Sequence, residues 1–264
     1  MSASLPAQSL PAVAARLRSA GCVFAEDEAR LLIAAAQTPA ELAAMVQARA
    51  AGQPLEHVLG WAEFCGLRIH VDSGVFVPRR RTEFLVSQAA GLLSPLPCPV
   101  IVDLCCGSGA LGVALAAAAG RPVDLHAADI DPAAVRCARR NVLPAGGQVY
   151  QGDLAGPLPA GLRGQVDVLL ANVPYVPTGE VALLPAEARE HEAQVALDGG
   201  PDGLDVLRRV AAVAPAWLGP GGHLLTEISD RQVAPATAAV TAAGLVPRLA
   251  RSAELGATVL IAAR

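Results

Sequence analysis

Apolar residues in the first fifty positions recur every three or four residues, which is the spacing of amphipathic helices. The positions that follow this spacing are Leu10, Val13, Leu17, Ala29, Leu32, Ile33 and Ala36. Thr38, Pro39 and Glu41 have the order of a helix N-cap, a proline at the first helical position and an acid in the first turn. The pattern therefore predicts a module of short helices over residues 10–50.

A different pattern follows between residues 52 and 78. The segment LRIHVDSGVFVP alternates apolar and polar side chains and contains a Ser-Gly pair, so it predicts a β-hairpin that bridges two domains. Residues 82–93 return to helical spacing, and a proline-rich stretch at 95–99 separates them from the rest of the chain.

From residue 100 onward, short apolar runs alternate with helical patterns. The helical patterns are clearest at 109–119 and 132–141. The predicted strands are 100–104, 123–128, 147–150, 166–171, 222–228 and 257–262. This alternation is typical of an α/β fold with a mostly parallel sheet covered by helices on both faces.

Length and composition fit one large domain with a small appendage. The chain has 264 residues, of which 53% are hydrophobic, enough for a substantial core. We divide it into a helical domain (1–55), a β-hairpin linker (56–80) and a larger α/β domain (81–264). The helical domain carries little chemistry of its own, so we interpret it as a substrate-recognition surface. The net charge of -4 argues against a dedicated nucleic-acid binder, which is usually basic.

No segment predicts export or membrane insertion. Residues 1–21 lack a basic start followed by an apolar run, and the uncharged stretch 84–102 is broken by Pro95, Pro97 and Pro99. The six cysteines contain no CxxC pair and no metal-ligand spacing. We therefore expect reduced thiols, no metal site and a cytoplasmic protein.

The first strand of the α/β part leads into a turn of small residues, in VIVDLCCGSGALGVALA. The turn follows Asp103 and comprises Cys105, Cys106, Gly107, Ser108 and Gly109. Small residues let the backbone approach a ligand, and the helix behind them presents its positive end. An acid before the turn suits a ligand with a cationic amino-acid head better than a pyrophosphate. A purely structural turn is the alternative, and we expect Cys105 and Cys106 to be small packing residues without a redox role.

Further acids follow the next two predicted strands. Asp129 ends the second strand, about 20 residues after the turn, where a carboxylate can accept hydrogen bonds from two ribose hydroxyls. Asp131 precedes Pro132 and is assigned to helix capping. Asp153 follows the third strand and is compatible with an adenine contact or with a simple turn. Because ligands bind at the carboxyl ends of strands in such sheets, these positions favour S-adenosylmethionine over NAD.

The fourth strand ends in LLANVPYVP, where Asn172 is followed by Val173, Pro174 and Tyr175. A turn asparagine is one interpretation. The other is chemical: an amide nitrogen is a poor nucleophile, and accepting both of its N–H hydrogens favours a pyramidal nitrogen with a freer lone pair. The Asn172 side-chain oxygen and the Val173 carbonyl can each accept one hydrogen. Pro174 stiffens the loop, and Tyr175 can stack on the flat target group.

The stretch ANVPY resembles the N-P-P-Y motif of the HemK/PrmC protein-glutamine N5-methyltransferases, and the resemblance covers most of the chain. GQPLEHVLGWAEFCGLRIHVDSGVFVPRRRTEFLV is similar to the family's G-x-P-x-x-Y-I-L-G…F-x-G-L…V-L-I-P-R-P-E-T-E segment. HEAQVALDGGPDGLDVLRRV resembles its E-P-x-x-A-L-D-G-G-x-D-G-L segment, which N6-adenine DNA methyltransferases with N-P-P-Y lack.

This resemblance implies a Rossmann-like class I methyltransferase domain preceded by a helical module. It also implies S-adenosylmethionine as methyl donor and, as acceptor, the glutamine of the GGQ tip of peptide chain release factors. A sister branch of the family modifies a glutamine of a ribosomal protein. Carried over by position, the resemblance implies that Cys105–Gly109 form the donor-binding turn. It also implies that Asp129 binds the ribose of the donor and that Leu154 lies beside its adenine. Asn172–Tyr175 form the glutamine clamp, with a secondary contact of Asn172 to the donor.

The chain departs from the family pattern at several positions. Val173 replaces the first proline of the motif, and Cys105 replaces a glycine of the turn. Arg80 and Arg81 replace the proline and the first glutamate of P-R-P-E-T-E, which gives three consecutive arginines with Arg79. Such a run is either a solvated face or a group that pairs with the donor carboxylate or with an acid or phosphate of a partner.

The sequence thus predicts methylation of a release factor glutamine by a monomer that does not bind nucleic acid directly. Two alternatives remain open. One is a related enzyme with another target, either a ribosomal protein glutamine or an amino group in nucleic acid. The other is a donor-binding interaction protein that has lost catalysis, an alternative that the substitution at Val173 keeps open.

Overall fold

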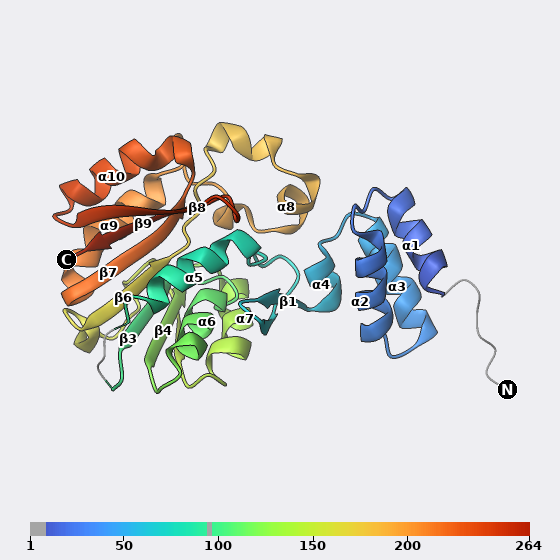
Figure 1. Ribbon diagram of the computed structural model, residues 1–264, viewed down its shortest axis with the longest axis horizontal. Helices are drawn as coiled ribbons and strands as arrows, with labels where there is room; N and C mark the ends of the chain where they lie inside the picture. The colour runs from blue at the N-terminus through green and yellow to red at the C-terminus, as the bar shows by residue number, and fades with distance from the viewer. Residues whose placement is uncertain (1–8, 94–96) are drawn as a thin grey trace.

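The computed structural model describes residues 9–93 and 97–264, so residues 1–8 and part of the proline-rich stretch, including Pro95, lie outside it. The helical start of the chain forms α1 (Leu10–Ser19), α2 (Ala25–Ala35) and α3 (Pro39–Ala50), as the spacing predicted. Their apolar faces form a separate core, against which the short helix α4 (Leu55–Leu59) packs. Figure 1 shows this module set apart from the main body and joined to it through α4.

The cap predicted at the start of α3 is confirmed. Thr38 Oγ1 accepts a hydrogen bond from the Glu41 backbone N–H at 3.1 Å, and Pro39 occupies the first turn. The Glu41 carboxylate accepts from the Gln37 N–H at 2.7 Å. Because these bonds satisfy N–H groups that a helix leaves unpaired, α3 begins at a defined residue.

The expected β-hairpin is present, but its position in the sequence differs from the prediction. It pairs β1 (Trp61–Phe64) with β2 (Leu67–His70) around a turn at Cys65 and Gly66, both with positive φ. The Ser-Gly pair at 73–74 was therefore the wrong turn. Gly74 instead pairs with Glu192 in an isolated parallel bridge.

A seven-stranded sheet forms the main body, which confirms the α/β prediction. Its order is β5-β4-β3-β6-β7-β9-β8, with β3 to β7 parallel and β9 antiparallel to both of its neighbours. The strands are β3 (Val100–Leu104), β4 (Asp124–Asp129), β5 (Gln148–Gln151), β6 (Val166–Ala171), β7 (Leu218–Ile228), β8 (Val246–Ser252) and β9 (Ala257–Ala263). All six predicted strands are thus present, and β8 is the strand that the sequence pattern missed.

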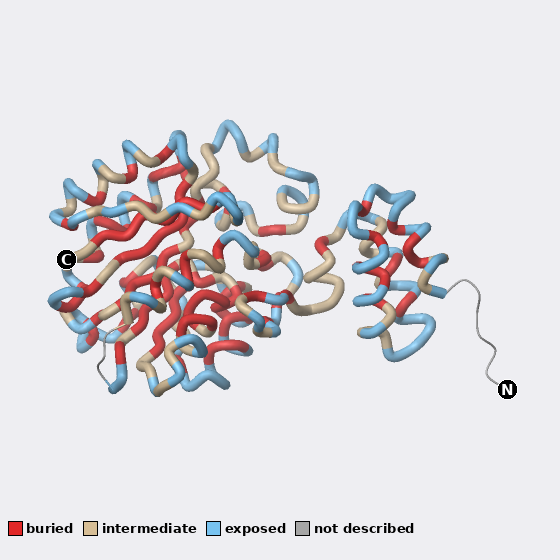
Figure 2. Tube along the Cα trace, viewed as in Figure 1, coloured by how far each residue is buried: buried red, intermediate tan, exposed pale blue. Residues whose placement is uncertain are grey.

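Helices cover both faces of the sheet, and the central strands are largely buried, whereas the edge strands β5 and β8 are partly exposed (Figure 2). Helices α5 (Glu83–Ala90), α6 (Ala110–Ala119) and α7 (Pro132–Val142) share one apolar cluster with one face. Helices α9 (Asp205–Trp217) and α10 (Val233–Ala242) pack on the other. In the part of the chain that the structure describes, no helix combines the length and apolar character needed to cross a membrane.

A long excursion separates β6 from α9 and carries α8 (Ala186–His191). The remaining short helical turns are η2 (Arg80–Thr82), η3 (Ala160–Leu162), η4 (Thr178–Leu183), η5 (Gln194–Ala196) and η6 (Asp230–Gln232). Two isolated bridges, Gly74 with Glu192 and Val176 with Asp198, fix the excursion beside the carboxyl ends of the strands. Arg49 Nη1 of α3 lies 3.3 Å from Glu187 Oε1 of α8, so the helical module also contacts the excursion.

Candidate active site

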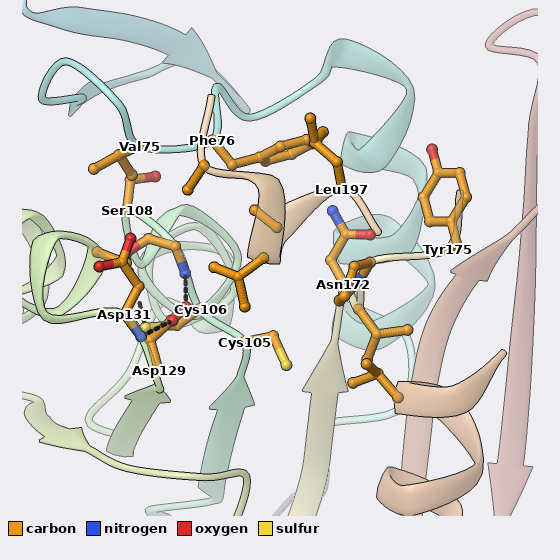
Figure 3. Close-up of a pocket in the computed structure, with 18 of the residues that line it drawn as sticks. Val75, Phe76, Cys105, Cys106, Ser108, Asp129, Asp131, Asn172, Tyr175 and Leu197 are labelled. Carbon is orange, nitrogen blue, oxygen red and sulfur yellow. Dashed lines mark hydrogen bonds between the residues drawn. The ribbon is translucent and has the colours of Figure 1, made fainter. Parts of the chain in front are cut away.

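A cavity of about 430 Å³ opens where β3, β4, β5 and β6 end. The residues of the predicted site that line it are Cys105, Cys106, Gly107, Ser108, Asp129, Asp153, Leu154, Asn172, Val173, Pro174 and Tyr175. The structure therefore brings together segments that are up to seventy residues apart in the sequence. Figure 3 shows Asp129 on one side of the cavity and Tyr175 on the other, with Asn172 between them.

The turn after β3 has an unusual backbone that holds it open toward the cavity. Cys105 has φ 54°, Gly107 φ 55° and Gly109 φ 79°, all in the left-handed region that favours glycine. The Cys106 N–H donates to the Ala128 carbonyl at 3.1 Å, which ties the turn to β4. Gly109 does not line the cavity; a Cβ there would lie 2.6 Å from the Val142 side chain, so this glycine permits close packing against α7.

The position of Asp103 differs from the expectation of a ligand contact. Its side chain is buried, lies behind the turn and does not line the cavity. One carboxylate oxygen accepts the Gly112 N–H at 2.9 Å, which anchors the first turn of α6. Burial raises the pKa of Asp103 to about 8, opposed by the Gly112 hydrogen bond. Asp103 therefore supports the turn from below and does not meet a cationic ligand group directly.

Asp129 lines the cavity as predicted, but its oxygens also bind the backbone. Oδ2 accepts the Gly107 N–H at 2.8 Å, and Oδ1 accepts the Asp131 N–H at 2.9 Å. Burial raises the pKa of Asp129, although these hydrogen bonds oppose the rise. Each carboxylate oxygen has a second lone pair, so the side chain can still accept from a ligand hydroxyl. Asp131 Oδ1 accepts the Ala133 N–H at 2.8 Å, which confirms it as the cap of α7.

The segment after β5 forms the next part of the wall. Asp153 forms an ion pair with Arg209 of α9, and Leu154 has φ 48°. Both residues line the cavity. The Asp153 carboxylate thus has a partner within the chain, while the apolar Leu154 side chain can face a flat ring.

Asn172 directly follows β6, and its partly exposed side chain has a buried oxygen, Oδ1, without a hydrogen-bond partner among the described residues. A buried amide oxygen without a partner costs about 1–3 kcal/mol, and such groups are rare in folded proteins. Asn172 lines the cavity beside Val173 and Tyr175, but its Oδ1 atom is itself covered, so a bound hydrogen-bond donor reaches it only when the side chain turns toward the cavity.

The arginine run is not simply a solvated face. Arg79 Nη2 donates to both oxygens of Glu192, at 2.6 and 2.7 Å, and Arg81 Nε donates to Glu227 Oε1 at 2.8 Å. Arg80 is exposed and makes no recorded side-chain contact with the described residues. Two of the three cations therefore neutralise carboxylates of the chain itself.

One wall of the cavity was not predicted from the sequence. It is formed by residues before η2 and by the excursion around α8, namely Val75, Phe76, Pro78, Leu184, Pro185, Glu187, Ala188, Ala193, Val195, Ala196 and Leu197. The Val77 N–H donates to Glu192 Oε1 at 3.1 Å, which joins the two segments. The residues before η2 and residues 193–197 belong to the stretches that resemble the family, and that resemblance was the signal available for finding them, whereas residues 184–188 lie outside both stretches.

Among the described residues there is no group of three or more His, Cys, Asp or Glu side chains that could hold a metal ion. All six cysteines are free, and burial first of all raises the pKa of both the Cys105 and the Cys106 thiol. Both are therefore neutral packing groups at ordinary pH.

Residues 66–202 match the methyltransferase small domain family. The release factor glutamine methyltransferase of Mycolicibacterium smegmatis is 41% identical over 210 residues, covering 77% of this chain and 73% of that protein. That of Bradyrhizobium diazoefficiens is 35% identical over 261 residues, 89% of this chain and 86% of that protein. That of Streptomyces coelicolor is 40% identical over 190 residues, with 71% and 67% coverage.

Solved structures share the fold at low sequence identity. The Thermus thermophilus 16S rRNA N2 G1207 methyltransferase, in complex with AdoMet and guanosine, has a TM-score of 0.55 and 20% identity, covering 77% of this chain and 49% of that one. The ribosomal protein L11 methylase of Lactobacillus delbrueckii has a TM-score of 0.53 and 16% identity, with 74% and 84% coverage.

Proposed function

The chain belongs to the family of release factor glutamine methyltransferases, and from this premise we propose that it methylates a glutamine side chain of a peptide chain release factor. S-adenosylmethionine is the methyl donor. The nitrogen of the target amide becomes N5-methylated, and the target is the glutamine of the GGQ tip. We further propose that the enzyme acts in the cytoplasm as a monomer, on the protein alone and without direct contact to nucleic acid.

The observation that carries the proposal is the unpaired Asn172 oxygen in the cavity wall. An incoming glutamine amide can donate one N–H to this oxygen and the other to the Val173 carbonyl. Both acceptors come from the loop after β6, which is held in place because Val173 packs in the apolar cluster between the sheet and helices α9 and α10. Holding both hydrogens favours a pyramidal nitrogen whose lone pair is available for attack.

The residues on the other side of the cavity fit a nucleoside methyl donor. The turn from Cys105 to Ser108 offers a backbone surface with little side-chain bulk, although the Cys106 and Gly107 N–H groups already donate within the chain. Asp129 offers free lone pairs for ribose hydroxyls, and Leu154 offers an apolar surface for the base. When bound, S-adenosylmethionine supplies a sulfonium methyl group, a cationic centre that makes transfer favourable. The chain's part is placement, because the amide nitrogen can lose its proton to water after the N–C bond has formed.

The test combines the purified protein, S-adenosylmethionine and purified release factors, with mass spectrometry to map each added methyl group. We expect one methyl group on the GGQ glutamine. The matched control is Asn172→Ala, which we expect to bind the donor with nearly unchanged affinity by calorimetry while transfer falls by about a hundredfold or more.

Other outcomes distinguish the alternatives. Methylation of a ribosomal protein or of nucleic acid, with no methyl on any release factor, would assign a different acceptor. Donor binding without transfer to any of these acceptors would favour an interaction protein. An Asn172→Ala variant with wild-type turnover would remove the side chain from the clamp.

A further inference from the structure

Three side chains from distant parts of the sequence meet at the acceptor side of the cavity, next to the clamp loop. Arg81 Nε donates to Glu227 Oε1 at 2.8 Å, and Arg81 Nη2 donates to the phenol oxygen of Tyr175. The Tyr175 hydroxyl in turn donates to Glu227 Oε1 at 3.3 Å. We refer to these residues as the Arg81–Tyr175–Glu227 triangle. Arg81 and Tyr175 line the cavity, whereas Glu227 lies behind them.

The buried corner of the triangle is Glu227, near the end of β7. Its side chain is only 4% exposed, and its second oxygen, Oε2, accepts the Thr82 hydroxyl at 2.7 Å. A carboxylate buried to this extent needs an opposing charge, and Arg81 supplies it. Because the Arg81 side chain remains 43% exposed toward the cavity, the guanidinium connects the protein interior with the site.

Tyr175 is held at both of its ends. Its backbone carbonyl accepts from Gln232 Nε2 at 2.8 Å, and the following Val176 N–H donates to the Leu197 carbonyl at 3.2 Å. The phenol end is fixed by the triangle. A ring that would rotate freely about its side-chain bonds therefore has one orientation relative to Asn172 (Figure 3).

The geometry points to Arg81 as a positioning residue for methyl transfer, which acts by fixing the Tyr175 ring against the acceptor amide. The inference rests on the proposed function, because it assigns Tyr175 to the acceptor. The inference is specific to this chain, because the family pattern has a glutamate at the position of Arg81. A glutamate there would bring a second carboxylate to Glu227, and like charges repel, so it could not form the same triangle.

The first experiment compares steady-state methylation by Arg81→Met and by Arg80→Met. Arg80 is the adjacent, exposed arginine without a recorded side-chain contact, so its variant removes the same charge from the same turn. We expect Arg81→Met to lower kcat about tenfold or more, because misplacement of a positioning group lowers the rate steeply. Donor affinity by calorimetry should change less than about twofold. Arg80→Met should match the wild type in both measurements.

A double variant and a conservative variant distinguish a loss of stability from a loss of positioning. Arg81→Met leaves Glu227 buried without its counter-charge, and Glu227→Gln in addition removes that charge. We expect the double variant to recover the melting temperature but not kcat. Arg81→Lys keeps a cation but lacks the planar fork that reaches two partners, so it should recover stability more fully than kcat.

A spectroscopic measurement tests the contact itself. The chain has only two tyrosines, so Tyr150→Phe leaves Tyr175 as the single phenol. Burial and Glu227 raise the pKa of Tyr175, whereas Arg81 lowers it. In the Tyr150→Phe background, ultraviolet titration of the phenolate should therefore show a higher pKa in Arg81→Met than with Arg81 present, while Arg80→Met leaves it unchanged.

Two results would overturn the inference. Wild-type kcat in a folded Arg81→Met variant would show that the triangle is not used in the reaction, and an unchanged phenol titration would show that Arg81 does not contact Tyr175. A wild-type enzyme that methylates no release factor defeats the proposed function and, with it, the catalytic role of Arg81; the titration then still reports whether the contact exists.

Discussion

Cys105 holds a backbone conformation that residues with a side chain rarely adopt. Its φ of 54° lies in the left-handed region, where a Cβ costs about 1–2 kcal/mol relative to glycine. The residue occupies a position where the family pattern has glycine, so the strain is specific to this chain. We expect Cys105→Gly to be more stable than Cys105→Ala by about 1 kcal/mol, as measured by denaturant unfolding.

The Ala variant is the matched control, because both substitutions remove the thiol and only glycine removes the Cβ. Equal stability of the two variants would show that the turn relaxes to another backbone conformation. Calorimetry with the donor should show no loss of affinity in Cys105→Gly, since the thiol stays neutral and the family pattern has glycine at this position.

Asp103 gives the turn a pH-dependent stability. Burial raises its pKa from 3.8 in the unfolded chain to about 8 in the folded one, so the folded state binds the proton more tightly. Its contribution to stability is therefore fully present below about pH 4 and is lost as the pH rises through about 8. We expect Asp103→Asn to show a smaller decrease in melting temperature between these limits than the wild type.

The comparison isolates Asp103, because the other buried acids with raised pKa, such as Glu192 and Asp129, are present in both proteins. If the melting temperatures of the two proteins changed by the same amount across this pH range, Asp103 would be ionised in the folded protein. This role of Asp103 could not be predicted from the sequence. The spacing placed an acid before the turn, but which side of the turn it faces depends on the packing of Gly112 against β3.

The clamp loop is one of the elements in which this chain departs from the family pattern. Val173 stands where the family motif has proline; it is 2% exposed and packs in the same apolar cluster as Ala171 and Leu204. Its N–H makes no recorded hydrogen bond with the described residues. A proline at this position therefore loses no recorded backbone bond, and its ring has as many side-chain carbons as valine.

We accordingly expect Val173→Pro to be tolerated. The fixed φ of proline reduces the freedom of the unfolded chain and typically gains about 0.4–1 kcal/mol at a compatible site. Methyl transfer should be equal or faster, because the carbonyl assigned to the acceptor is held more firmly. Melting temperature and single-turnover methylation are measured together. A decrease in both would mean that this chain has remodelled its clamp around valine.

Helices and strands whose apolar residues form a clear pattern could be predicted from the sequence, whereas those with a weak pattern could not. The run VDVLLA at 166–171 is apolar throughout, and β6 has the predicted bounds. By contrast, β8 contains Pro247, Arg248 and Arg251 and has no buried residue, as expected of a strand at the edge of the sheet, and no alternation identified it. In the hairpin, the Ser-Gly pair was the stronger turn signal, but Cys65 and Gly66 make the turn.

At the scale of the whole molecule, the cavity depends on contacts between segments far apart in the sequence. Strand ends could be predicted, and with them Asp129 and Asn172, because parallel strands point their carboxyl ends to one edge. The cavity wall around Phe76 and Leu197 could not be predicted. The two segments that form it are joined by Glu192, which binds the Val77 N–H and Arg79. Nothing in the local pattern of either segment specifies that long-range pairing.

The helical module is tied to this wall but adds no residue to the cavity. Every described residue that lines the cavity follows position 74 in the chain. Arg49 of α3 binds Glu28 within the module and also lies 3.3 Å from Glu187 of the excursion. The module has its own apolar core, to which α4 contributes Leu55, Val58 and Leu59. A clean truncation must therefore remove α4 with the module and start at Gly60, just before β1.

We expect residues 60–264 alone to fold and to bind the donor with an affinity within about threefold of the full chain. The shortened enzyme should methylate a short peptide containing the target glutamine, because the clamp and the turn are intact. Intact release factor should be a poor acceptor, with a raised KM, since the surface that we assign to its recognition is gone. The same truncation carrying Asn172→Ala provides the inactive control in both assays. Equal kcat/KM of the truncated and full-length enzymes on intact release factor would exclude the module from recognition. Loss of donor binding would show that the contacts removed with the module and α4, Arg49 with Glu187 and His57 with Val75, maintain the cavity wall.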